Sequence, residues 1–139
     1  MEYVIIFIVV IVVIIAIINN SKDSEELVEK SLEEKFNVII NHICDYAFDG
    51  DYNVKHLSKK HIMFFHSEIS NQMIEILYNQ GVLTIIWKYK YFQKELKFKK
   101  HLNNVRNLSL FEQDKIGASI VGLMSLKINE FQQKILKNS

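Results

Sequence analysis

Four histidines and one cysteine lie within 25 residues of one another and are the residue types best suited to hold a metal ion. They are His42, Cys44, His56, His61 and His66. Zinc takes four nitrogen, sulfur or oxygen ligands in a tetrahedron. Local ligand pairs on a helix normally stand four residues apart, so that both side chains point the same way. His42 and Cys44 are two apart and His61 and His66 are five apart, so we predict no metal site and no cofactor.

Catalytic chemistry has no recognisable motif in this chain. There is no GxSxG elbow, no P-loop and no HExxH. The acidic stretch from Asp49 to Asn53 has oxygen ligands at alternate positions, but an EF-hand loop needs Gly at its sixth position and Glu at its twelfth, which here are Val54 and Lys60. We therefore predict that the protein is not an enzyme.

Charge is strongly segregated along the chain, although its net value is only +1. Residues 23–51 carry nine acids and two lysines, whereas residues 88–106 carry seven bases and one acid, interleaved with aromatic residues. Three interpretations are open: packing of the basic segment against the acidic one, contact with anionic lipid headgroups, and binding of an acidic protein partner. Nucleic acid is not expected, because no recognised module for it is present. The predicted contact residues are Trp87, Lys88, Lys90, Lys94, Lys97, Lys99, Lys100 and Arg106.

An uncharged run of residues at the N-terminus predicts a membrane anchor for the domain that carries these residues. From Tyr3 to Ile18 there are sixteen residues without charge, thirteen of them Val or Ile. Such a run is typical of a membrane-spanning helix, so residues 1–20 are predicted to be a transmembrane anchor in the lipid bilayer. Lys22, Lys30 and Lys35 follow it and no base precedes it, which favours an outside N-terminus and a cytoplasmic domain. The anchor side chains are Tyr3, Phe7, Ile11, Ile15 and Ile18.

The absence of proline and the spacing of apolar residues predict helices over residues 21–139. A first helix is expected from Asp23 to about Phe48, a second over about 54–80, and a last one opened by a capping box at Ser109 and Glu112. Residues 82–92 are rich in β-branched and aromatic types, which favours a strand. Helix is nevertheless preferred there, because no second strand is evident. The predicted fold is all-α: a single transmembrane helix followed by a four-helix bundle-like soluble domain.

These features together predict a membrane-anchored helical protein that acts by protein–protein interaction. It would be an adaptor, an immunity-type inhibitor or an accessory subunit of a membrane complex. One alternative is a metal- or ligand-responsive sensor that uses the His42–His66 region. The other is an anionic-lipid surface regulator that acts through Lys88–Arg106.

Overall fold

The computed structural model describes residues 3–14, 27 and 30–138. Residues 3–14 are helical and their apolar side chains are exposed. No helix in the described ranges combines the length and the apolar character needed to cross a bilayer; about 20 residues are required. The predictions of a single-pass membrane protein and of a cytoplasmic domain behind an anchor are therefore not supported. Ile15 and Ile18 of the predicted anchor, and the helix start at Asp23, lie outside the described residues.

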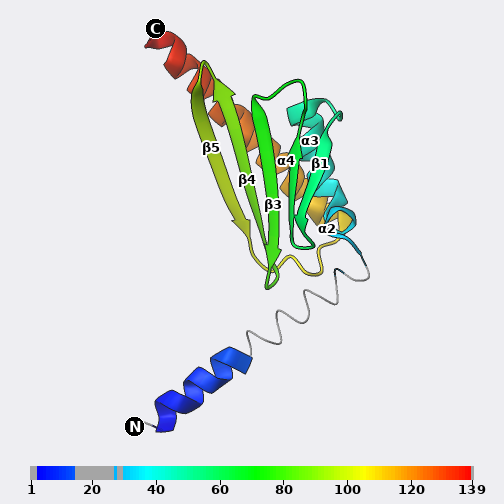
Figure 1. The fold of residues 1–139 in the computed structure, drawn as a ribbon, viewed down its shortest axis with the longest axis vertical. Coiled ribbons are helices and arrows are strands. Elements are labelled where there is room, and N and C mark those ends of the chain that lie inside the picture. Colours follow the sequence, from blue (N-terminus) through cyan, green and yellow to red (C-terminus); the bar gives the residue numbers. More distant parts are fainter. Residues whose placement is uncertain (1–2, 15–26, 28–29, 139) are drawn as a thin grey trace.

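The all-α prediction is wrong, because residues 53–102 form a five-stranded antiparallel sheet. Its strands follow one another in space in the order β1-β2-β3-β4-β5 (Figure 1). The strands are β1 (Asn53–Ser58), β2 (His61–Phe65), β3 (Gln72–Asn79), β4 (Val82–Tyr91) and β5 (Lys94–Leu102). The helices are α2 (Leu32–Lys35), α3 (Asn37–Phe48) and α4 (Leu110–Lys137). A helical bundle is thus replaced by a mixed α/β fold.

Two-residue turns explain why residues 72–102 form hairpins and not one long helix. Gln80 and Gly81 connect β3 to β4 with φ of 52° and 74°, and Phe92 and Gln93 connect β4 to β5 with φ of 49° and 65°. Positive φ at both central residues suits the right-handed twist of the two strands that such a turn joins. Gly81 adopts this conformation without strain, whereas Phe92 and Gln93 are residue types that do not signal a turn. The second hairpin is consequently hard to recognise from the sequence.

The core lies between one face of the sheet and the helices α3 and α4, which Figure 1 shows on the same side of the sheet. Side chains along β4 alternate between buried and partly exposed, the pattern of a sheet with one covered face. The ring of Tyr78 packs edge-to-face against Phe36, with 5.3 Å between centroids. The amide of Gln132 in α4 donates a hydrogen bond to the Tyr89 hydroxyl at 2.6 Å. Both helices therefore pack against the same face of the sheet. Among the described residues, no helix covers the opposite face.

Two predicted helix boundaries are confirmed at the two ends of the domain, whereas the single helix expected up to Phe48 is wrong, because Phe36 divides it into α2 and α3. The α3 helix ends at Phe48, with Asp49 in the left-handed conformation. The predicted capping box opens α4, because the Ser109 hydroxyl accepts a hydrogen bond from the backbone N–H of Glu112 at 3.1 Å. These local signals hold because a helix cap depends on residues three positions apart and not on the rest of the fold.

Candidate functional site

The uncovered side of the sheet, here called the open face, carries an apolar centre. Strand alternation places on it the residues that stand between the core residues of β2, β3 and β4. Half-buried apolar side chains at these positions are Met63, Phe65, Met73, Leu77 and Ile86. A solvated face of an antiparallel sheet is usually polar. The apolar side chains at these positions therefore make the open face a candidate contact surface.

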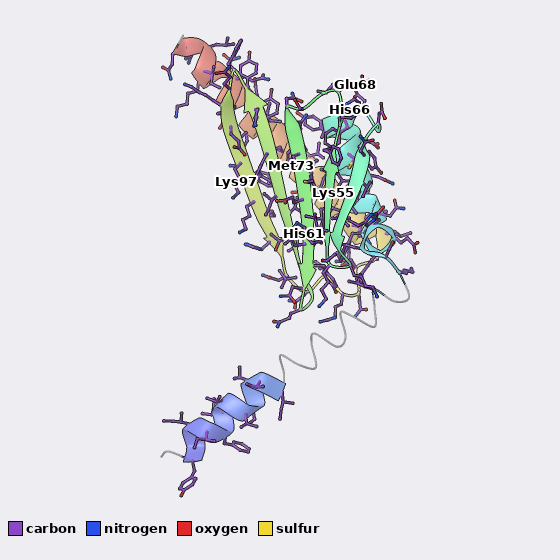
Figure 2. The ribbon with its side chains drawn as sticks, viewed as in Figure 1. Lys55, His61, His66, Glu68, Met73 and Lys97 are labelled. Atoms are coloured by element: carbon purple, nitrogen blue, oxygen red, sulfur yellow. The ribbon has the colours of Figure 1, made fainter. Side chains whose placement is uncertain are left out.

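Lysines lie on both sides of the apolar centre, on β1 and on β4 and β5. One row across the sheet runs Asn53, Phe65, Met73, Lys88, Lys97, and the next runs Lys55, Met63, Glu75, Ile86, Lys99. Figure 2 labels Lys55, Met73 and Lys97 across this arrangement on β1, β3 and β5. With Lys90 and Glu95, which pair with each other across β4 and β5, the open face has five lysines and two glutamates. Its formal charge is +3.

The sheet divides the predicted contact residues into two groups. The open face carries Lys88, Lys90, Lys97 and Lys99. Strand alternation places Lys94 and Lys100 on the opposite side of the sheet, because they pair with Tyr91 and Ile85. Arg106 lies beyond β5 in the connection to α4, where its backbone carbonyl accepts a hydrogen bond from Lys35 at 2.6 Å.

Trp87 is completely buried and is not available for contact with a partner. Its indole N–H donates to the Gln72 side chain at 2.8 Å, and its ring packs against Tyr46.

Lys88 and Lys97 stand directly opposite each other. Lysines on an edge strand such as β5 discourage pairing with another strand that does not carry acidic residues, which accounts for Lys97 and Lys99. That explanation does not apply to Lys88, because β4 is an interior strand. Like charges directly opposite each other destabilise a sheet. The pair therefore lowers folding stability and concentrates positive charge at one point of the open face.

Glu75 is the acid closest to the apolar centre, and it faces His61. Nε2 of His61 lies 3.5 Å from Oε1 of Glu75, and the two side chains are 28% and 21% exposed. This separation is too long for a hydrogen bond of good geometry, and Nε2 of His61 has no hydrogen-bond partner among the residues that the structure describes. The Glu75 carboxylate is thus directed to a histidine and not to the lysines of the open face.

A shallow cavity of about 240 Å³ opens on the open face where β3 begins. Its lining residues are Ser70, Asn71, Gln72, Met73, Lys88, Lys90 and Glu95. Two lysines and several polar groups around a cavity of this size suit the carboxylate end of a side chain better than an apolar ligand.

The histidines that the sequence brings together are separated by the fold. Each lies beside a different carboxylate: His42 beside Asp114 at 2.7 Å, His56 beside Glu33, His61 beside Glu75 and His66 beside Asp51 at 3.4 Å. Nδ1 of His66 also accepts hydrogen bonds from the backbone N–H groups of Glu68 and Ile69, so this histidine organises a turn. Within the described residues no group of three or more histidine, cysteine or acidic side chains could hold a metal ion.

Cys44 is buried in α3 and unpaired. Burial, with a smaller contribution from the charge of Asp45, raises the pKa of its thiol from 9.0 to about 12. The unfolded chain therefore releases this proton near pH 9 and the folded chain releases it only at higher pH. The stabilisation is complete below the lower of these values and is lost as pH rises towards 12.

We expect chemical denaturation between about pH 8 and 11 to show a stability difference between the natural chain and Cys44→Ala that shrinks as pH rises. The natural chain should also resist thiol reagents at neutral pH until denaturant is added. Parallel pH dependence of the two proteins, or rapid labelling of the folded protein, would contradict this assignment.

The apolar centre and the pairing of Lys88 with Lys97 were not foreseen from the sequence. Met73, Ile76 and Leu77 also fit a helical spacing, which hid the alternation of β3. The available signal was the Asn-Gln-Gly sequence at residues 79–81 between two runs rich in β-branched and aromatic residues, which is typical of a hairpin.

Comparison of the chain with protein families, with curated proteins and with solved structures finds no match.

Proposed function

We propose that this protein is a non-catalytic binding module that recognises an acidic protein partner through the open face of its sheet. The observation that carries the proposal is the pairing of Lys88 with Lys97. Two positive charges held side by side on an interior and an edge strand weaken the isolated fold. An acidic partner that contacts both lysines would relieve this repulsion on binding.

The surroundings of the two lysines support a protein as the partner. Protein interfaces combine an apolar core with a polar rim. The open face has Met63, Phe65, Met73 and Ile86 between a lysine of β1 and the lysines of β4 and β5. Methionine side chains are flexible and adapt to different surfaces. This combination suits an adaptor, an inhibitor of another protein or an accessory subunit. In each of these roles the protein acts by occupying a surface.

Site-specific photocross-linking tests the proposal in the cells that produce the protein. The full chain would carry p-benzoylphenylalanine in place of Phe65, and we expect a discrete cross-linked adduct with another protein. Adding Lys88→Glu and Lys97→Glu should reduce this adduct by at least about tenfold, because two attractive contacts become repulsive. The adduct is quantified by immunoblotting.

The matched control is the pair Lys94→Glu and Lys100→Glu, which changes the net charge equally. These two positions of β5 lie on the side of the sheet opposite the open face. The adduct should therefore persist. Absence of any adduct at position 65, or an adduct equally sensitive to both pairs, would overturn the proposal. A sharp protein band also distinguishes a protein partner from lipid, which yields no band at a new protein mass.

A further inference from the structure

We infer that the partner binds by adding an extended acidic strand to the free edge of β5. This inference rests on the proposed function and specifies how the partner is held. Strand β5 is at the end of the sheet, with β4 as its one neighbour among the described strands. It extends over nine residues, Lys94–Leu102, which is long enough to pair with a peptide strand of ordinary length.

The register identifies which backbone groups of β5 point outwards. The backbone N–H of Lys90 donates to the carbonyl of Asn71, so Lys90 and the alternate residues of β4 face β3. The backbone groups of the intervening β4 residues point to β5, where they form hydrogen bonds with the backbone groups of Leu96, Phe98 and Lys100. The backbone groups of Lys97 and Lys99 accordingly point away from the sheet. No hydrogen bond to these outward groups is found within the described part of the chain.

The residues of β5 whose backbone groups point outwards are also the ones that carry the positive charge of β5 on the open face. Residues of β5 that offer free N–H and C=O groups also place their side chains on the open face. Lys97 and Lys99 are both exposed. An incoming antiparallel strand would therefore bring the residues that exchange backbone hydrogen bonds with them next to the two ammonium groups. Glutamate or aspartate at those positions completes both kinds of contact.

The opposite edge of the sheet is less suited to strand addition. Strand β1 has six residues, and its pairing with β2 is irregular between His56 and Ser58. The side chain of His56 is also engaged by Glu33 of α2. Irregularities of this kind protect an edge from further pairing. The regular and strongly basic β5 is therefore the edge at which an acidic segment would add, in the manner of β-augmentation.

A synthetic peptide gives a direct test with the full chain, kept in solution with a neutral detergent. The probe is a nine-residue fluorescent peptide in which glutamate alternates with threonine, and binding is measured by fluorescence anisotropy. In antiparallel addition the glutamate N–H groups face β5. N-methylation of the glutamates should therefore weaken binding by at least about tenfold, whereas N-methylation of the threonines leaves the hydrogen bonds to β5 intact. All three peptides have the same charge and sequence.

Two variants of the protein make the complementary test. Lys99→Pro removes an outward N–H together with the charge, and Lys99→Ala removes the charge alone. Proline is tolerated where the N–H of an edge strand faces solvent, and circular dichroism checks that both variants are folded. We expect the proline variant to bind the unmethylated peptide several-fold more weakly than the alanine variant.

The outcomes separate this inference from the function on which it rests. Equal affinity of the parent peptide and both methylated peptides, or no binding of the parent peptide, would overturn strand addition. The cross-linking at position 65 would still decide independently whether the open face binds an acidic protein. A loss confined to the threonine-methylated peptide would support addition at the same edge in the parallel orientation, because the alternate N–H groups then face β5.

Discussion

Replacing Trp87 by alanine is expected to lower the free energy of unfolding by about 3–5 kcal/mol. Its side chain is fully buried at the centre of β4, so truncation leaves a large cavity beneath α3. The substitution also removes the donor of the 2.8 Å hydrogen bond to Gln72. Urea denaturation followed by circular dichroism measures the change.

Two further substitutions determine whether the loss comes from packing. Trp87→Phe keeps an aromatic ring but leaves the Gln72 oxygen without its donor, and a loss of about 1–3 kcal/mol is expected. Phe111→Ala truncates an aromatic side chain that is 67% exposed at the start of α4, and should change stability by about 0.5 kcal/mol. A loss for Trp87→Ala no larger than that for Phe111→Ala would show that Trp87 is not in the core.

The second large effect is expected at Gly117, where α4 crosses α3. A Cβ atom added at Gly117 would lie 2.9 Å from Cβ and 2.6 Å from Cδ2 of His42. Cβ of His42 is fixed to the α3 backbone, so the helices must separate. Overpacking of this kind costs about 1–3 kcal/mol, and the better helix propensity of alanine offsets about 1 kcal/mol. Gly117→Ala should therefore destabilise the protein by up to about 2 kcal/mol net.

Gly122 provides the matched control in the same helix. A Cβ atom there would meet nothing within 4 Å, so Gly122→Ala should stabilise the protein by up to about 1 kcal/mol. Thermal denaturation of the two variants should thus move the melting temperature in opposite directions. Two shifts of the same sign would contradict the close contact between α3 and α4.

The helical ends of the domain could be predicted because their signals are local. The cap formed by Ser109 and Glu112 and the end of α3 at Phe48 each depend on a few neighbouring residues. The prediction for the middle of the chain was wrong for the opposite reason. Strand pairing depends on residues far apart in sequence, and the turn at Phe92 and Gln93 has no residue type that announces it. Apolar residues at both two- and four-residue spacing then allowed a helical interpretation of residues 54–102.

The candidate site shows the same division between local and long-range information. The sequence alone determined that positive charge gathers over residues 88–106, because composition does not depend on conformation. Only the tertiary structure decided which side chains act together. Because side chains of a strand alternate, Trp87 lies in the core and Lys88 lies on the open face. The register of β4 and β5 places Lys88 opposite Lys97. Had the segment been helical, with its period of 3.6 residues, these side chains would have had different neighbours.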